Sequence, residues 1–297
     1  MATSSQLGLS CALALPLTGS FDIDFRRLIA HAHRCVASGC SSITLFGTTG
    51  EGASISLAER EQILAALSKG GIHMDQIIGS VTASSAGDAV VQARLLIETG
   101  CCAALVVPPF YFKDVTEEGL YNWFARFCEK LEEDRIAVFL YHIPSVTATP
   151  LSLRLISRLR ESFPKIIKGV KDSGSDWSYT EALLKSHNDL AILIGNERHL
   201  AAGVRLGAAG AISGLANLSP ESLLRVIETG KEDQWITSLA TEILRFPVIP
   251  AIKVLLAYRD NHPAWATPRP PLVKLSQSEA TSLLLAYDRV RSEPSPG

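Results

Sequence analysis

The run Ala104-Leu105-Val106-Val107 places four apolar residues in succession, without the apolar–polar alternation of a half-exposed strand. Such a run predicts a strand that is buried on both faces, which is typical of a parallel sheet covered by helices. Similar short runs recur along the chain, and each is followed by a helical pattern. The expected strands are Leu9–Leu15, Ser42–Phe46, Gln76–Val81, Ala103–Val107, Ile136–Tyr141, Ile166–Lys171, Ala191–Ile194 and Gly210–Ser213.

Eight β–α units within about 230 residues predict an α/β fold of the (β/α)8 or TIM barrel type. A doubly wound sheet is the alternative, but no G-x-G-x-x-G motif opens a helix to support it. Helix starts are also recognisable between the strands. Ser56 and Glu59 match a capping box, and Asp176 is placed to cap a helix over Trp177–Lys185.

The β–α alternation stops after Gly230. Three further helices are expected, and a proline-rich connector precedes the last of them. Their ranges are Asp233–Arg245, Val248–Tyr258 and Ser276–Arg291. We therefore expect a catalytic barrel domain at residues 1–230 and a C-terminal helical extension at residues 231–297.

The composition argues against several classes of protein. With 47% hydrophobic residues and a formal net charge of −2, the 297-residue chain is expected to be globular with a large core. No basic cluster indicates nucleic-acid binding, and no stretch approaches the roughly 18–20 apolar residues that cross a membrane. The first residues lack the basic and apolar regions of a signal peptide, so a cytoplasmic location is expected.

The six cysteines lack the spacing of a metal site, so we expect neither a metal ligand nor a catalytic cysteine among them. Buried free thiols are the expected state in a cytoplasmic enzyme. The cysteines are Cys11, Cys35, Cys40, Cys101, Cys102 and Cys128.

Residues able to do chemistry follow several of the expected strand ends. In a barrel of this type the active site forms at the carboxyl ends of the strands, so these residues should meet at one rim. They are Thr48 and Thr49 after the second strand, Tyr111 after the fourth, Tyr141 at the end of the fifth, Lys171 at the end of the sixth, Gly195 and Glu197 after the seventh, and Ile212 near the end of the eighth.

Lys171 takes the last position of a buried strand. Strand alternation predicts that Ile167 and Lys171 share a face, and that Tyr141 on the neighbouring strand, ~4.8 Å away, can reach the lysine. Burial disfavours a charged amine, and a neutral lysine amine can attack a carbonyl carbon to form an imine. The alternative is a lysine that extends towards solvent and pairs with Asp172 or Glu197.

The run Gly47-Thr48-Thr49-Gly50 places two hydroxyls between glycines and next to backbone N–H groups. This pattern suits a cradle for a small carboxylate, although the hydroxyls could equally close a turn of their own. A carboxylate cradle and a half-buried amine on one rim indicate an enzyme that captures a 2-oxo acid as an imine. Tyr141 is expected to face the cavity rather than the core, and His142 is expected to be a hydrogen-bonded structural residue.

Together these motifs resemble the dihydrodipicolinate synthase/N-acetylneuraminate lyase family of class I pyruvate aldolases. The resemblance extends over nearly the whole chain. It rests on the segments 47–51, 109–111, 141–145, 169–174 and 269–272, which occur in the order of the family. It implies a lyase that needs no metal or organic cofactor, because a protonated imine itself stabilises the carbanion left when a carbon–carbon bond breaks.

The resemblance also implies roles for individual positions. Lys171 would form the imine with pyruvate or a pyruvate-yielding substrate, and Tyr141 would move protons to and from the substrate oxygen. Thr48 would link Tyr141 to Tyr111, which reaches into the site of a neighbouring subunit. Thr48 and Thr49 would hold the substrate carboxylate. Further substrate-binding positions are Ser173, Gly195, Glu197 and Ile212.

The chain departs from the family at Val146. In synthases that make dihydrodipicolinate, an arginine in this segment binds the carboxylate of the second substrate, and valine cannot form that pair. We therefore expect a small-molecule 2-oxo acid substrate, with 2-oxo-3-deoxy sugar acids among the candidates. The expected reaction is carbon–carbon cleavage or condensation by a pyruvate-releasing aldolase, or carbon–oxygen cleavage by a dehydratase of sugar-derived 2-oxo acids. The alternatives are 4-hydroxy-tetrahydrodipicolinate synthase and a non-catalytic 2-oxo acid binding protein.

The extension carries apolar helical faces that eight β–α units do not require. Their residues are Trp235, Ile236, Leu239, Ile243, Leu244, Ile252, Leu255 and Leu256. Together with the implied reach of Tyr111, these faces predict a homo-oligomer, either a dimer or a tetramer built as a dimer of dimers.

Overall fold

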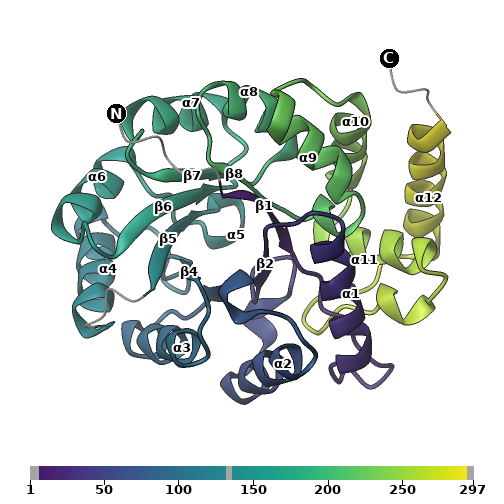
Figure 1. Cartoon of the computed structure of the whole chain (residues 1–297), viewed down its shortest axis with the longest axis horizontal. Helices are drawn as coiled ribbons and strands as arrows, with labels where there is room; N and C mark the ends of the chain where they lie inside the picture. Colours follow the sequence, from purple (N-terminus) through teal and green to yellow (C-terminus); the bar gives the residue numbers. More distant parts are fainter. Residues whose placement is uncertain (1–6, 132–135, 293–297) are drawn as a thin grey trace.

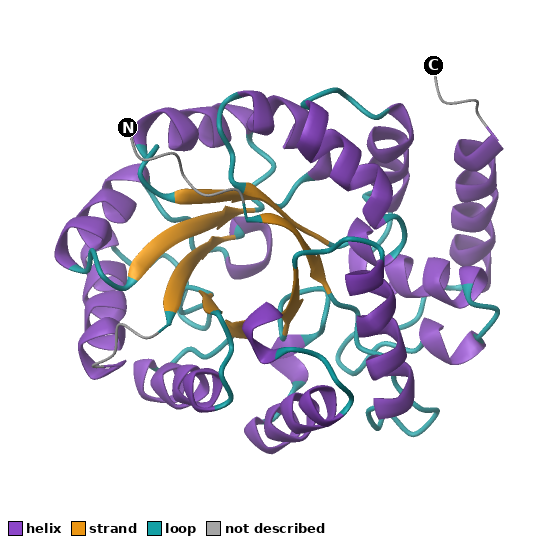
Figure 2. Cartoon of the chain, viewed as in Figure 1, coloured by secondary structure: helices purple, strands orange, loops and turns teal. Residues whose placement is uncertain are grey.

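The computed structural model describes residues 7–131 and 136–292. Its strands close into a parallel barrel in sequence order, with β1 hydrogen-bonded to β8, so the predicted (β/α)8 barrel is confirmed. Figures 1 and 2 show the strands as an inner ring with the helices around it, except for the short α5 (Pro144–Thr147), which is seen within the ring in this view. The strands are β1 (Gly8–Ala12), β2 (Ser42–Leu45), β3 (Ile77–Val81), β4 (Ala103–Val106), β5 (Ala137–His142), β6 (Ile167–Asp172), β7 (Ala191–Ile194) and β8 (Gly210–Ser213).

Helices connect the strands, and short 3-10 turns follow several strand ends. The helices of the barrel are α1 (Phe25–Ala37), α2 (Leu57–Lys69), α3 (Ala86–Glu98), α4 (Glu117–Leu131), α5 (Pro144–Thr147), α6 (Leu153–Ser162), α7 (Trp177–Ser186), α8 (Leu200–Arg205) and α9 (Pro220–Thr229). The turns are η1 (Gly52–Ser54), η2 (Met74–Gln76), η3 (Glu197–His199) and η4 (Leu215–Asn217). Among the described helices, none is both long and apolar enough to span a membrane.

The local signals placed helix starts better than strand ends. Ser56 and Glu59 form the predicted capping box, and the Asp176 side chain accepts a hydrogen bond at the start of α7. β1, in contrast, ends at Ala12 rather than at the predicted Leu15. Leu13 to Leu15 are buried even so, because they pack as the chain leaves the barrel. The apolar run therefore predicted which residues are buried, and the buried residues extend past the last residue of β1.

The predicted face of Ile167 is wrong. β6 holds one more residue than its partner β5 at a register shift, and that residue is Lys168. Lys168 is exposed, and Ile167 packs in the core between the barrel and its helices. Beyond Gly169 the strand pairs residue by residue with β5, which brings Lys171 opposite Tyr141. The bulge therefore moves Ile167 to the outer face and leaves Lys171 facing the barrel interior.

The C-terminal extension consists of α10 (Gln234–Ile243), α11 (Val248–Arg259), η5 (Pro263–Ala266) and α12 (Gln277–Ser292). In Figure 1, α12 lies on the outer side of the molecule, and it packs against α10 and α11. The apolar faces that suggested a partner are largely covered within the chain, since Ile236, Leu239, Leu255 and Leu256 are all buried. These faces therefore give no separate reason to expect an oligomer.

The cysteines are all free, and five of them are buried as predicted. Cys102 is exposed, so the prediction is wrong for this residue. It immediately precedes β4, and its Sγ donates a hydrogen bond to the carbonyl oxygen of Ile77 at 3.1 Å.

Candidate active site

Lys171 and Tyr141 lie opposite each other near the ends of β6 and β5. Lys171 is 5% exposed, and its Nζ donates a hydrogen bond to the Tyr141 hydroxyl at 3.1 Å. The same Nζ lies 4.4 Å from the centre of the Tyr141 ring. The lysine is thus held between neighbouring strands with its amine at the carboxyl end of the barrel.

The alternative partners of Lys171 are engaged elsewhere. The carboxylate of Asp172 accepts hydrogen bonds from the Gly174 N–H and the Thr180 hydroxyl. The carboxylate of Glu197 accepts from Ser213 Oγ at 2.6 Å. Within the described part of the chain, no carboxylate lies at ion-pair distance from Lys171. The alternative interpretation of the sequence, in which Lys171 forms an ion pair with Asp172 or Glu197, is therefore not found in the structure.

Tyr141 joins the lysine to the loop after β2. Its hydroxyl lies 3.3 Å from Thr48 Oγ1, and the side chain is buried. Burial raises the pKa of Tyr141, but the Lys171 charge and the hydrogen bonds from Thr48, Lys171 and Ser173 outweigh it, so the pKa lies below its ordinary value. A phenol in this state can both give up and take back a proton, which is the property of an acid–base group.

The loop after β2 folds into a tight turn that presents Thr48 and Thr49. The Glu51 N–H donates to the Thr48 carbonyl, and the Gly52 N–H donates to the Gly47 carbonyl, both at 3.0 Å. A side chain at Gly52 would place its Cβ 1.6 Å from the Phe46 carbonyl oxygen. Glycine is therefore required at Gly52, because the chain passes over its own backbone.

Arg60 on α2 holds this loop in place through hydrogen bonds and a ring contact. Its guanidinium donates to the Gly52 carbonyl at 2.9 Å and to the hydroxyl of Thr82, and it lies over the Phe46 ring at 4.6 Å. Burial lowers the pKa of Arg60 to about 10. Sequence reasoning missed this residue, because an arginine in an amphipathic helix pattern gives no sign that it turns inward.

A cavity of about 210 Å³ opens beside Lys171, and most of the predicted site residues line it. Thr48, Thr49, Tyr141 and Lys171 are among the residues that line it. The remaining predicted substrate-binding residues that line it are Ser173, Gly195, Glu197 and Ile212. Gly195 is needed for close packing, because a Cβ there would lie 2.0 Å from Ser173 Oγ.

The C-terminal extension forms one wall of this cavity. Its apolar contributors are Ala240, Ile243 and Leu244 from the α10 region and Val248 and Ile252 from α11. Nothing in the sequence indicated this wall, because helical periodicity shows which face of a helix is apolar but not what that face covers. The lining of the site thus crosses the boundary predicted at residue 230.

Tyr111 is the predicted catalytic residue that the structure does not bring to the cavity. Its side chain is 74% exposed, and its ring packs edge-on against Phe112. Among the described residues that line the cavity, Tyr111 is absent, so the implied link from Thr48 to Tyr111 is not made within one chain.

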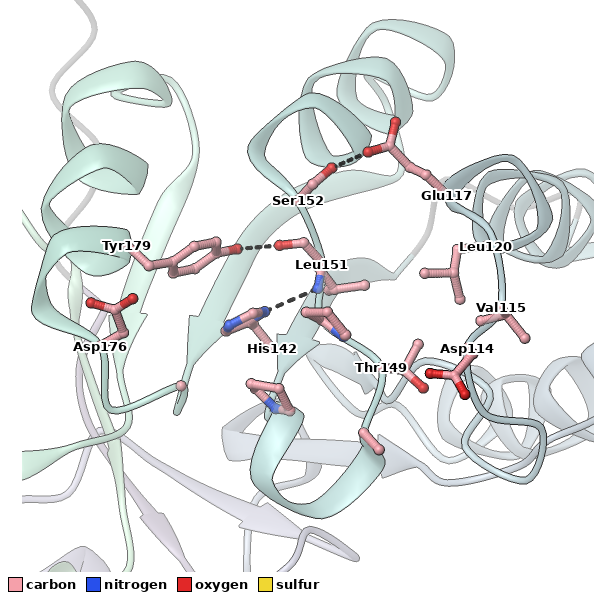
Figure 3. A pocket seen from close by; sticks show the side chains of 14 residues that line it. Asp114, Val115, Glu117, Leu120, His142, Thr149, Leu151, Ser152, Asp176 and Tyr179 are labelled. Atoms are coloured by element: carbon pink, nitrogen blue, oxygen red, sulfur yellow. Dashed lines mark hydrogen bonds between the residues drawn. The ribbon is translucent and has the colours of Figure 1, made fainter.

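A second cavity of about 630 Å³ lies outside β5 and β6, and His142 lines it (Figure 3). His142 Nδ1 accepts the Leu151 N–H at 3.1 Å, and its ring stacks on Tyr179 at 4.1 Å. Burial lowers the pKa of His142, although Asp172 and Asp176 oppose the shift. These contacts agree with the prediction that His142 is structural.

Metal ligands are not grouped in the residues that the structure describes: no set of three or more histidine, cysteine, aspartate or glutamate side chains is close enough to hold an ion. The chemistry of the site is carried by an amine, a phenol and two hydroxyls. An amine beside a phenol can attack a carbonyl carbon and exchange the protons that this attack requires.

Comparisons with known proteins agree with this arrangement. The model of the dihydrodipicolinate synthetase family matches residues 5–286. An uncharacterized DapA-like lyase from Chloroflexus aurantiacus is 31% identical over 297 residues, which cover 97% of this chain and 98% of that protein. The 4-hydroxy-tetrahydrodipicolinate synthase of Aromatoleum aromaticum is 28% identical, over 95% of this chain and 97% of that protein.

One solved structure is similar in both sequence and fold. The crystal structure of dihydrodipicolinate synthase from Agrobacterium tumefaciens is 44% identical in sequence and matches with a TM-score of 0.93. The match covers 96% of this chain and 99% of that one.

Proposed function

The chain belongs to the dihydrodipicolinate synthetase family and is a lyase of the class I aldolase type, and within this class we propose that Lys171 captures a 2-oxo acid as an imine. The observation that carries the proposal is the hydrogen-bonded set of Lys171, Tyr141 and Thr48 at the end of a cavity. An amine, a proton carrier and a carboxylate cradle are the three groups that imine formation from a 2-oxo acid requires.

The proposed reaction begins when the Lys171 amine, having given up a proton, adds to C2 of the substrate and water leaves. Tyr141 supplies and removes the protons, and Thr48 and Thr49 hold the carboxylate. Tyr141 then takes the proton of the C4 hydroxyl, the C3–C4 bond breaks, and the protonated imine accepts the electron pair of that bond. An aldehyde leaves, the enamine takes a proton at C3, and water releases pyruvate. This route uses no metal or organic cofactor, because the imine itself is the electron sink.

The cavity walls favour a substrate whose far end is uncharged. Among the described residues that line the cavity, Lys171 is the only cationic side chain, and Glu197 contributes a carboxylate. A second carboxylate on the substrate would meet Val146, which cannot pair with it, and the negative charge of Glu197. We therefore favour a 2-oxo acid with a hydroxylated tail, such as a 2-oxo-3-deoxy sugar acid.

The second candidate is 4-hydroxy-tetrahydrodipicolinate synthase, which condenses pyruvate with aspartate semialdehyde. The 44% identity to a structure of dihydrodipicolinate synthase favours it, and the uncharged wall at Val146 opposes it. A third candidate, a 2-oxo acid binding protein without catalysis, would have no use for the proton carrier Tyr141.

Borohydride reduction with pyruvate tests the proposal. We expect the wild-type chain to gain one three-carbon unit, and the Lys171→Ala variant to gain none, as measured by intact-protein mass spectrometry. Unchanged mass of the wild type would reject the imine. A panel of 2-oxo-3-deoxy sugar acids, N-acetylneuraminate, 4-hydroxy-2-oxoglutarate, and pyruvate with aspartate semialdehyde then separates the candidates. Labelling without turnover on any of them would favour the binding protein.

We also propose that the active form is a homo-oligomer, with a dimer of dimers as the expected state. Tyr111 supports this, because an exposed tyrosine that does not reach its own site is free to enter a neighbouring one. A third cavity, of about 370 Å³, shares Thr48 with the active-site cavity, and a tyrosine from a neighbouring subunit could enter it. Light scattering of the active enzyme tests this, and an active monomer would exclude both the assembly and a shared Tyr111.

A further inference from the structure

Glu51 lies on the loop that presents Thr48 and Thr49, and its side chain is almost fully buried. One carboxylate oxygen accepts a hydrogen bond from Lys253 Nζ on α11, and the other accepts the backbone N–H of Arg269. The Lys253 side chain is 0% exposed. Both groups that hold this carboxylate therefore come from the C-terminal extension, more than 200 residues away in sequence.

The ion pair is joined rigidly to the cradle. Glu51 has a left-handed backbone conformation with φ 56°, and its N–H closes the turn on the Thr48 carbonyl. Lys253 follows Ile252, which lines the active-site cavity. The Arg269 guanidinium is fixed in turn by Glu59 at 2.8 Å and by the Ser54 carbonyl at 3.0 Å. A shift of the extension would thus be passed to the cradle through a buried, inflexible contact.

We infer that the Glu51–Lys253 ion pair positions the Thr48–Thr49 cradle for the substrate carboxylate, so that Lys253 is a positioning residue of the active site. This inference rests on the proposed function. An unpaired charge at this depth would be strongly unfavourable, so the pair and the extension hold the loop in one arrangement. The extension is then part of the catalytic unit rather than an outer cover of the barrel.

The test replaces both charges together, because removing one would leave the other buried alone. The variant is Glu51→Gln/Lys253→Met, and its control is Glu242→Gln/Arg289→Met, which removes a partly exposed pair between α10 and α12. Each protein is titrated with pyruvate and with pyruvamide, which has the same carbonyl but no carboxylate. Borohydride capture gives the half-saturating concentration of each, and their ratio measures recognition of the carboxylate.

We expect this preference for pyruvate to fall about tenfold or more in Glu51→Gln/Lys253→Met, the worth of a hydrogen bond to a charged group. The control variant should keep the wild-type ratio. The ratio does not depend on the fraction of the protein that is folded. If the Glu51–Lys253 pair only stabilised the fold, the ratio would stay at its wild-type value. An unchanged ratio would therefore overturn the inference. If the double variant does not fold, Glu51→Asp is measured in its place, because it keeps both charges of the pair but shortens the side chain by one methylene, so that the carboxylate and the loop cannot both keep their positions. The same fall in the ratio is expected, and an unchanged ratio would again overturn the inference.

Failure of this inference is distinguishable from failure of the proposed function. A wild-type chain that pyruvate and borohydride do not label would reject imine formation. A wild-type chain that is labelled, with a carboxylate preference that the double variant shares, would reject only the positioning role of Lys253.

Discussion

The chain buries two lysines in different surroundings, one in the barrel and one in the C-terminal extension. Lys171, at the end of β6, meets the phenol of Tyr141 beside an open cavity. Lys253, on α11, meets the carboxylate of Glu51 and has no exposed surface. Burial lowers the pKa of Lys253, and Glu51 opposes the shift. On the proposed mechanism the partner decides the difference: the carboxylate keeps the Lys253 amine engaged, whereas the phenol beside the cavity would leave the Lys171 amine able to attack a substrate.

The largest expected effect comes from removing Lys171. Lys171→Met should abolish borohydride capture of pyruvate, because no other cationic side chain lines the cavity in the described part of the chain. Stability should not fall, since the change removes a buried amine that has no carboxylate partner. Mass spectrometry and urea denaturation measure the two effects. A variant that lost both labelling and stability would show that Lys171, like Lys253, stabilises the fold.

The next effect concerns the phenol that distinguishes the two lysines. Tyr141→Phe keeps the ring beside Lys171 and removes only the hydroxyl that contacts the amine and Thr48. Turnover on the best substrate of the panel should fall roughly 10²–10⁴-fold, the usual worth of a positioned acid–base group. Steady-state kinetics with circular dichroism as the folding control measure this. Near-normal turnover would remove Tyr141 from the mechanism.

Lys253→Met should affect stability more than chemistry. It leaves the Glu51 carboxylate buried without its cation, which costs about 3–5 kcal/mol when one partner of a buried pair is removed. The free energy of unfolding, from urea denaturation, should therefore fall by that amount in Lys253→Met and by much less in Glu51→Gln/Lys253→Met. Equal losses in the two variants would show that the lost packing of the lysine, and not the unpaired charge, is responsible.

The sequence predicted Lys171 and overlooked Lys253 for a physical reason. Strand order and strand ends are local signals, and barrel closure converts them into neighbours, so Lys171, Tyr141 and Thr48 could be grouped without a structure. The pair of Glu51 and Lys253 joins segments 202 residues apart by tertiary packing, which leaves no local pattern.

Two further differences between the prediction from the sequence and the structure also arise from tertiary packing. The bulge at Lys168 changes the face of Ile167, although the strand there looks regular in the sequence. The extension lines the cavity through residues such as Ile243 and Val248, which look like ordinary core positions. Apolar patterns therefore predicted which residues are buried, but not which partner buries them.

The smallest predicted effect concerns a buried histidine, His142, which is held by the Leu151 N–H and the Tyr179 ring. Its folded-state pKa is lowered, mainly by burial, so the unfolded chain binds the proton more readily. Stability is thus present above the unfolded pKa of ~6.5 and is lost as the pH falls towards the folded pKa.

His142→Asn keeps an acceptor for Leu151 but cannot titrate. Urea denaturation at pH 7.5, 6.5 and 5.5 should show a shallower loss in the variant, by no more than about 1.4 kcal/mol per pH unit. The slope should not vanish, because burial also lowers the pKa of His187 and of His199. Parallel curves for the two proteins would mean that the pKa of His142 is the same in the folded and the unfolded chain. Burial in this protein would then disfavour a charged side chain less than the comparison of Lys171 with Lys253 assumes.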